Sequence, residues 1–175
     1  MASLSSLRSR RASDRQAQVS QQYVAFRLRA AWFVLPVTAI YRVLPLENKI
    51  LPKVTFEGKS IPIVDAGRLL FGKEPVKPAA PLVLGGSAVA EQPSLFVIQS
   101  GDGVMASLPS NSQPGLLRLS QDKLMTLPPQ LAQRWQVDFM AGMIQPTAER
   151  PALFAIDPDR FVAIANGLNP HSSGL

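Results

Sequence analysis

The stretch "KVTFEGKSIPIVDAGRLLFG", Lys53 to Gly72, decides the fold of this chain. Its pattern predicts a strand, a Glu57-Gly58 turn, a second strand with an apolar end, and a short helix closed by Gly72. Asp65 stands where the strand becomes the helix. A helix can use such a carboxylate as its N-cap, whereas an enzyme can use it as an acid or base. The stretch alone leaves both interpretations open.

The end of the chain repeats this arrangement in "ALFAIDPDRFVAI", Ala152 to Ile164. Asp157 again follows an apolar strand, and Pro158 occupies the first helical position, which proline tolerates well. Nothing near Asp65 or Asp157 in the sequence supplies a nucleophile or a second acid–base group. We therefore predict that both aspartates are helix caps, each worth about 1 kcal/mol. A pair of catalytic carboxylates is the alternative.

Short apolar runs separated by prolines predict an all-β fold with short helices. The 16 prolines are too many for a helix bundle, because each removes a backbone donor. Alternation at Val24, Phe26 and Leu28 predicts a half-buried strand with Arg27 and Arg29 on its wet face. Further strands are expected at Ala31–Val37, which pairs with the first as a hairpin, and at Ile40–Leu46. The segment "SLFVIQSGDGVMASL" predicts another hairpin, because Gly-Asp-Gly suits a tight turn.

The residue inventory argues against an enzyme. The chain has no cysteine and a single histidine, His171, in a polar tail. Disulfides, thiolate chemistry and multi-histidine metal sites are thereby excluded within one chain. No phosphate-cradling glycine loop is present either. We expect no catalytic residue, no cofactor and no bound metal.

The formal net charge of +6 is unevenly distributed. Four arginines lie in the first 22 residues with only Asp14 to oppose them, so residues 1–22 are predicted to be a flexible basic arm. A small β-barrel that binds nucleic acid through this arm is the alternative function. Nucleic-acid surfaces usually need a basic stripe on the folded domain itself. No apolar run is long enough to span a bilayer and no export signal is present, so we expect a cytoplasmic protein without membrane insertion.

From about Tyr23 to Asn166 the chain resembles the CheW-like family, the adaptor modules of bacterial chemosensory arrays. The element "IPIVDAGRLLFG" is similar to the family's Pro-Val-Val-Asp-Leu-x-x-Leu-Leu-Gly signature. The opening "YVAFRLRAAWFVLPVTAIYRVLPL" resembles the family's strand pair and its Val-x-Glu-Val segment. The later segments "LLRLSQDKLMTLPP", "VDFMAGMI" and "ALFAIDPDRFV" follow the family's second half in order.

The resemblance implies two five-stranded β-barrels packed over a shared hydrophobic seam. It implies a CheW-like domain at residues 23–167, with subdomain one at about 23–72 plus part of a linker, the linker at 73–93, and subdomain two at about 94–166. Residues 168–175 are expected to be a tail. It also implies a non-enzymatic adaptor that couples a methyl-accepting chemoreceptor to a CheA-type histidine kinase and so controls flagellar or pilus motility.

The chain departs from the family at the residues expected to bind partners. Arg42 stands where the family has glutamate, and Glu57 where it has arginine, so the two could pair with their charges exchanged. The segment "PSNSQPG", Pro109 to Gly115, replaces apolar residues that contribute to partner contact in the family. These departures are compatible with a narrower or different set of partners. The expected protein-binding residues are Ile40, Arg42, Val43, Glu57, Gly58, Val104 and Ala106.

Overall fold

The computed structural model describes residues 19–46 and 52–167. The expected tail at 168–175, His171 and most of the expected basic arm lie outside the described residues. Within these residues strands predominate, and three short α-helices accompany them, which confirms the predicted all-β class with short helices. The first strand begins at Ser20, within the segment that was expected to be an arm.

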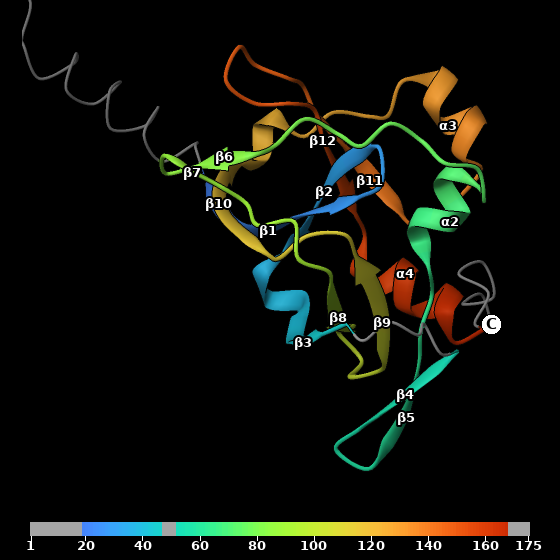
Figure 1. Cartoon of the computed structure of the whole chain (residues 1–175). Coiled ribbons are helices and arrows are strands. Elements are labelled where there is room, and N and C mark those ends of the chain that lie inside the picture. Colours follow the sequence, from blue (N-terminus) through green and yellow to red (C-terminus); the bar gives the residue numbers. More distant parts are fainter. Residues whose placement is uncertain (1–18, 47–51, 168–175) are drawn as a thin grey trace, which may run out of the picture.

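Five strands form the first sheet, which takes its members from both ends of the chain (Figure 1). In spatial order they are β10 (Gly115–Ser120), β1 (Ser20–Leu28), β2 (Ala31–Pro36), β12 (Leu153–Ile156) and β11 (Met140–Ile144). The β1–β2 pair is the predicted hairpin. β2 then pairs in parallel with β12, a contact between residues more than a hundred positions apart.

The second unit consists of a three-stranded sheet and a separate two-stranded hairpin. Its continuous part has the order β3 (Ile40–Pro45), β8 (Ser94–Gln99) and β9 (Met105–Ser110). The hairpin of β4 (Lys53–Phe56) and β5 (Lys59–Pro62) joins β9 where the chain leaves β5, through a parallel bridge between Ile63 and Ser107. The two β units that the resemblance implied are therefore present in the described residues, as an open five-stranded sheet and as a three-stranded sheet joined to a hairpin, rather than as closed five-stranded barrels.

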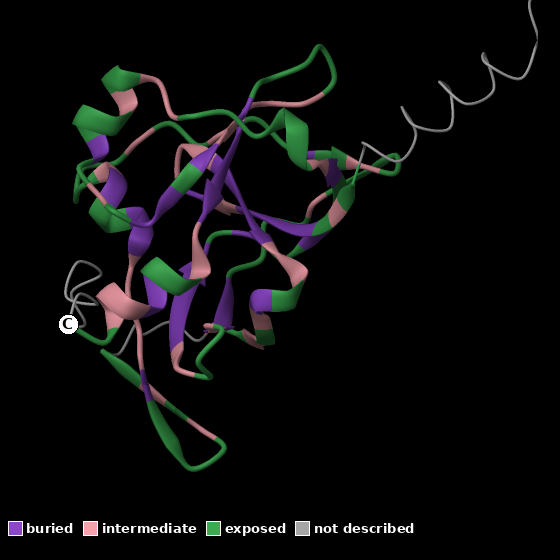
Figure 2. Ribbon diagram, turned by 180° about the vertical axis from the view of Figure 1, so that it is seen from behind, coloured by how far each residue is buried: buried purple, intermediate pink, exposed green. Residues whose placement is uncertain are grey.

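A single apolar core lies between the two sheets. β1 and β2 contribute Phe26 and Phe33, and β8 contributes Phe96, all fully buried. The rings of Phe26 and Phe96 lie 5.0 Å apart between centroids, which joins the sheets directly. Figure 2 shows the buried strands at the centre and the exposed β4–β5 hairpin at the edge. Because aromatic side chains bury large apolar areas, this contact contributes strongly to the packing between the sheets.

The other face of the first sheet is covered as well, contrary to the prediction that β1 is half-buried. Ala25 is fully buried in a second cluster with Trp32, Val34 and Leu82. Leu82 belongs to the segment predicted as a linker, residues 73–93, and the Trp32 indole N–H donates to the carbonyl of Ala80 at 2.7 Å. This segment therefore packs over the sheet, and its short strands β6 (Val83–Leu84) and β7 (Ser87–Ala88) form a hairpin there.

Two of the described helices, those that follow Asp65 and Asp157, occupy the predicted positions. The described α-helices are α2 (Ala66–Phe71), α3 (Pro129–Trp135) and α4 (Pro158–Ala165). The amide of Arg68 donates to Asp65 Oδ1 at 3.0 Å, and the amide of Arg160 donates to Asp157 Oδ1 at 3.2 Å. Both aspartates are N-caps, as predicted. Gly72 ends α2 with a positive φ of 73°, a conformation that glycine adopts without steric cost.

The segment Pro109–Gly115 forms a polar corner where the chain passes from β9 to β10. Its hydroxyl and amide groups bond to the end of β1, beyond the point where β10 stops pairing with it. The amide of Arg27 donates to Ser112 Oγ at 2.9 Å, and the amide of Arg29 donates to Asn111 Oδ1 at 2.7 Å. Ser110 and Ser112 are both buried. Polar side chains here complete the backbone hydrogen bonds of β1, which explains why this segment is polar.

Candidate protein-binding site

The β4–β5 hairpin extends from the body of the molecule and ends in a tight turn (Figure 1). Glu57 and Gly58 occupy the turn with φ of 50° and 75°. Two consecutive residues with positive φ characterise the type I′ turn, whose twist matches that of the flanking strands. The turn therefore holds the Glu57 side chain at the tip of a regular hairpin.

Strand β3 presents two neighbouring side chains to solvent because it contains a bulge. Its pairing with β8 shifts between Ile40 and Arg42, leaving Tyr41 as the extra residue. A bulge interrupts the alternation of side chains, so Tyr41 and Arg42 are both exposed. Tyr41 is one of the few large apolar side chains that are well exposed among the described residues.

The bulge of β3 and the tip of the hairpin meet in a small cluster, here called the tip cluster and defined as Tyr41, Arg42, Phe56 and Glu57. The Tyr41 hydroxyl donates to Glu57 Oε2 at 3.0 Å, and its ring meets the Phe56 ring edge-on at 5.8 Å. Arg42 lies over the Phe56 ring at 5.6 Å, with its Nη2 4.0 Å from Glu57 Oε1. These side-chain contacts connect β3 with the far end of the hairpin.

Arg42 and Glu57 form the ion pair that the sequence suggested, with the two charges exchanged relative to the family. The side chains of Arg42 and Glu57 are 57% and 50% exposed, so their ion pair contributes only about 0–1 kcal/mol to stability. The hydrogen bond from Tyr41 to Glu57 raises the pKa of the Tyr41 phenol above its usual 10.0, and the negative charge of Glu57 adds to this effect. Charges that contribute little to folding remain available to select a partner.

The structure places the seven predicted residues in three different environments. Arg42, Glu57 and Gly58 are exposed at the tip. Ile40, Val43 and Val104 are half-buried and pack against the core. Ala106 is fully buried, with no exposed side-chain surface for a partner in this conformation. The structure therefore gathers only the charged residues and the turn into one exposed surface.

Sequence reasoning missed Tyr41 and Phe56, which supply the aromatic part of the cluster. Strict alternation along β3 gives no reason for Tyr41 and Arg42 to point the same way, and the bulge has no clear signature in the sequence. Phe56 stands directly before the Glu-Gly turn, and that position is the signal that could have found it, because residues flanking a hairpin turn lie at its exposed end.

The described residues form neither a metal site nor a membrane-spanning helix. Within residues 19–46 and 52–167, no three His, Asp or Glu side chains gather closely enough to hold a metal ion. The longest described helix, α4, has eight residues, and no described helix is long and apolar enough to cross a bilayer. Asp65 and Asp157 cap their helices rather than face each other across a cleft.

Fold and site together define a two-sheet β module with an exposed cluster suited to contact with other proteins. The chain belongs to the CheW-like domain family, whose sequence model matches residues 22–165. Among solved structures, the chain is similar to the crystal structure of the scaffolding protein TtCheW from Thermoanaerobacter tengcongensis. The TM-score is 0.55 at 14% sequence identity, covering 79% of this chain and 84% of that one, a likeness of fold. Comparison with curated protein sequences gives no match.

Proposed function

We propose that this protein is a non-enzymatic adaptor of a chemosensory pathway, coupling a methyl-accepting chemoreceptor to a CheA-type histidine kinase in the cytoplasm and so controlling motility. The observation that carries the proposal is the match of the CheW-like family over residues 22–165, almost the whole described chain. The neighbouring structure of TtCheW is that of a scaffolding protein, which supports the same role.

We propose further that the tip cluster is the surface that a partner contacts. Tyr41, Phe56 and Arg42 belong to the residue types that most often dominate the energy of protein interfaces. Their mutual contacts fix the side chains before binding, which lowers the entropy lost on association. The exchanged charges of Arg42 and Glu57 then favour a partner whose own charges are arranged to match, and disfavour one adapted to the opposite order.

A pulldown with the purified full-length chain as bait tests the class of function. Recovery of a CheA-type kinase or a chemoreceptor, identified by mass spectrometry, is the expected result. Recovery of nucleic acid alone would instead support the alternative of a nucleic-acid binder, and that binding should weaken steeply with salt. Nuclease treatment of the lysate separates protein partners held directly from those held through nucleic acid.

The role of the exchanged charges is tested by a double-mutant cycle with the recovered partner. Arg42→Glu and Glu57→Arg are made singly and together, and the dissociation constant is measured for each. Each single change should weaken binding about tenfold, because like charges then meet within the cluster or across the interface. The double variant should differ from the product of the single effects, since the two residues are coupled. Strictly additive effects would show that the pair does not act as a unit.

A further inference from the structure

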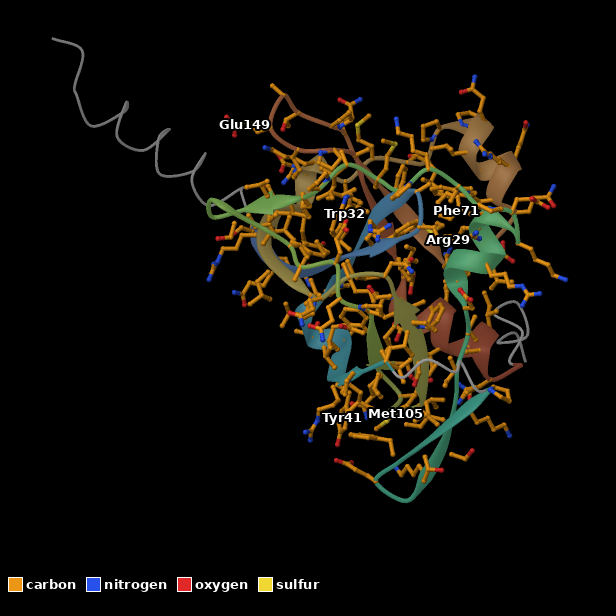
Figure 3. The ribbon with its side chains drawn as sticks, in the orientation of Figure 1. Arg29, Trp32, Tyr41, Phe71, Met105 and Glu149 are labelled. Atoms are coloured by element: carbon orange, nitrogen blue, oxygen red, sulfur yellow. The ribbon has the colours of Figure 1, made fainter. Side chains whose placement is uncertain are left out.

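A second surface, on another side of the molecule from Tyr41, has the character of a binding site for negative charge. It is a hollow of about 410 Å³ between the β1–β2 turn, the helix α2 and the polar corner. Figure 3 shows Arg29 beside α2 and well separated from Tyr41 at the hairpin end. We call it the basic hollow and define it by three cations that line it, Arg29, Arg68 and Lys73, together with the half-buried Leu46 and the buried Leu28 and Pro109.

Arg29 is held in place by the fold itself. It lies in the turn after β1 with a positive φ of 53°, and its amide is bound by Asn111. Its guanidinium donates to the carbonyl of Gly72 at the end of α2 and, at 2.5 Å, to the carbonyl of Glu74. A guanidinium has five N–H donors, so these two bonds orient the group without exhausting it. Folding has therefore already fixed the position of this cation, which lowers the entropy lost when an anion binds.

The charge balance of the hollow favours an anion. Arg68 and Lys73 are exposed beside Arg29, while Asp65 is the one carboxylate among the described lining residues. Asp65 already accepts the amide of Arg68 as the cap of α2, so part of its charge is directed to the helix. Gly67 contributes no side chain, and the Arg29 methylenes pass 3.4 Å from where its Cβ would stand. Among the described lining residues, three cations therefore face a single carboxylate.

From these observations we infer that the basic hollow binds an acidic segment of a partner protein, with carboxylates on the cations and an apolar side chain against the half-buried Leu46. A nucleic acid fits less well, because a phosphate backbone requires a stripe of cations along the surface rather than three around a small apolar floor. The planar donors of arginine pair well with carboxylates. This inference goes beyond the proposed function and involves neither the kinase nor the receptor. The inference and the proposed function can therefore each fail without the other.

The test titrates the full-length chain with a fluorescein-labelled oligoglutamate peptide that ends in leucine with a free carboxylate. Fluorescence anisotropy gives the dissociation constant, and amide chemical shifts locate the peptide. The inference predicts saturable binding that shifts the amides of Arg29, Gly72 and Asn111, and much weaker binding of the matching oligoglutamine peptide. Binding should also weaken as salt is added, since exposed charges are screened.

Charge-reversal variants assign the binding to the hollow. Arg68→Glu with Lys73→Glu should weaken the peptide about tenfold, because two of the three cations become repulsive. The control Lys123→Glu with Arg134→Glu makes the same change of net charge at exposed positions elsewhere and should leave the affinity unchanged. Unfolding midpoints of both variants check that the fold is intact.

The inference is overturned by several results. It fails if the peptide does not bind, if it shifts amides away from the hollow, or if both double variants weaken it equally. Binding of an oligothymidine at the hollow in preference to the acidic peptide would reassign the surface to nucleic acid.

Discussion

At the scale of single residues, the roles of the acids are decided by their hydrogen bonds. Asp65 and Asp157 each accept an amide hydrogen bond from the residue three positions later. That is the geometry of an N-cap, which satisfies a helix N–H that has no partner within the helix. Asp157 also lies 3.6 Å from the guanidinium of Arg160, a further local contact. Both carboxylates are therefore used by the backbone of their own helices.

The caps lead to a stability prediction. Asp65→Ala and Asp157→Ala should each lower the free energy of unfolding by about 1 kcal/mol, because a helix N–H loses its acceptor. Asp65→Asn and Asp157→Asn should lose much less, since asparagine also caps helices. Urea unfolding measures the difference, with exposed Glu91→Ala as the control. Equal losses for alanine and asparagine would show that charge, and not capping, is what matters.

The Tyr41 phenol provides a test of the tip cluster without any partner. Glu57 raises its pKa above 10.0 by accepting its proton in a hydrogen bond and by its charge. Stability from this bond is complete below the unfolded pKa of about 10 and is lost as the pH rises through the higher folded value. In a Tyr23→Phe background, Tyr41 is the one remaining tyrosine, and ultraviolet absorbance reports its ionisation. Glu57→Gln should bring its pKa down towards 10. An unchanged titration would contradict the contact.

At the scale of elements, the polar corner between β9 and β10 replaces ladder bonds with side-chain bonds. Ser112 Oγ accepts the amide of Arg27, and Ser110 Oγ donates to the carbonyl of Ser112 at 2.9 Å. Both serines are buried, so each broken bond leaves a polar group without water. The corner thus closes the end of β1 where its β10 partner is missing.

Two serine variants separate this role from mere burial. Ser112→Ala should lower the free energy of unfolding by about 1–3 kcal/mol, because it leaves the partly buried Arg27 amide without an acceptor. Ser107 is equally buried, but its hydroxyl has no hydrogen-bond partner among the described residues. Ser107→Ala should therefore be neutral or stabilising. Chemical denaturation of the two variants gives the comparison, and equal destabilisation would argue against a specific hydrogen-bonded corner.

Elements marked by short-range sequence patterns were predictable from the sequence. The pairing and packing of these elements with segments distant in the chain were not. The Asp caps, the Glu57-Gly58 turn and the β8–β9 hairpin follow from short-range patterns, and the structure contains each of them. The parallel pairing of β2 with β12 has no local signature, because the two strands lie far apart in the chain. Burial of Ala25 and of Ala106 likewise depends on which distant element covers them. A polar segment such as Pro109–Gly115 gave no sign of which backbone groups it would bond.

At the scale of the whole molecule, one core shared by both sheets determines which surfaces remain for binding. Two of the predicted contact residues, Val43 and Ala106, occupy apolar strand positions. Ala106 is buried in that core, and Val43 packs against it. The tip cluster stays outside because its hairpin extends beyond the core. The binding surface that we propose is therefore a small aromatic and charged cluster rather than an apolar seam between barrels.

We propose that this CheW-like module binds its signalling partner through the tip cluster. Isothermal titration of the full-length chain with the regulatory domain of the CheA-type kinase from the same cell tests it most directly. We predict saturable binding that Tyr41→Ala weakens about tenfold or more, as expected for an interface hot spot, with only a small fall in the unfolding midpoint, because the exposed hydrogen bond to Glu57 contributes little to stability. Absence of binding, or equal affinity of the Tyr41→Ala variant and the native chain, would contradict it.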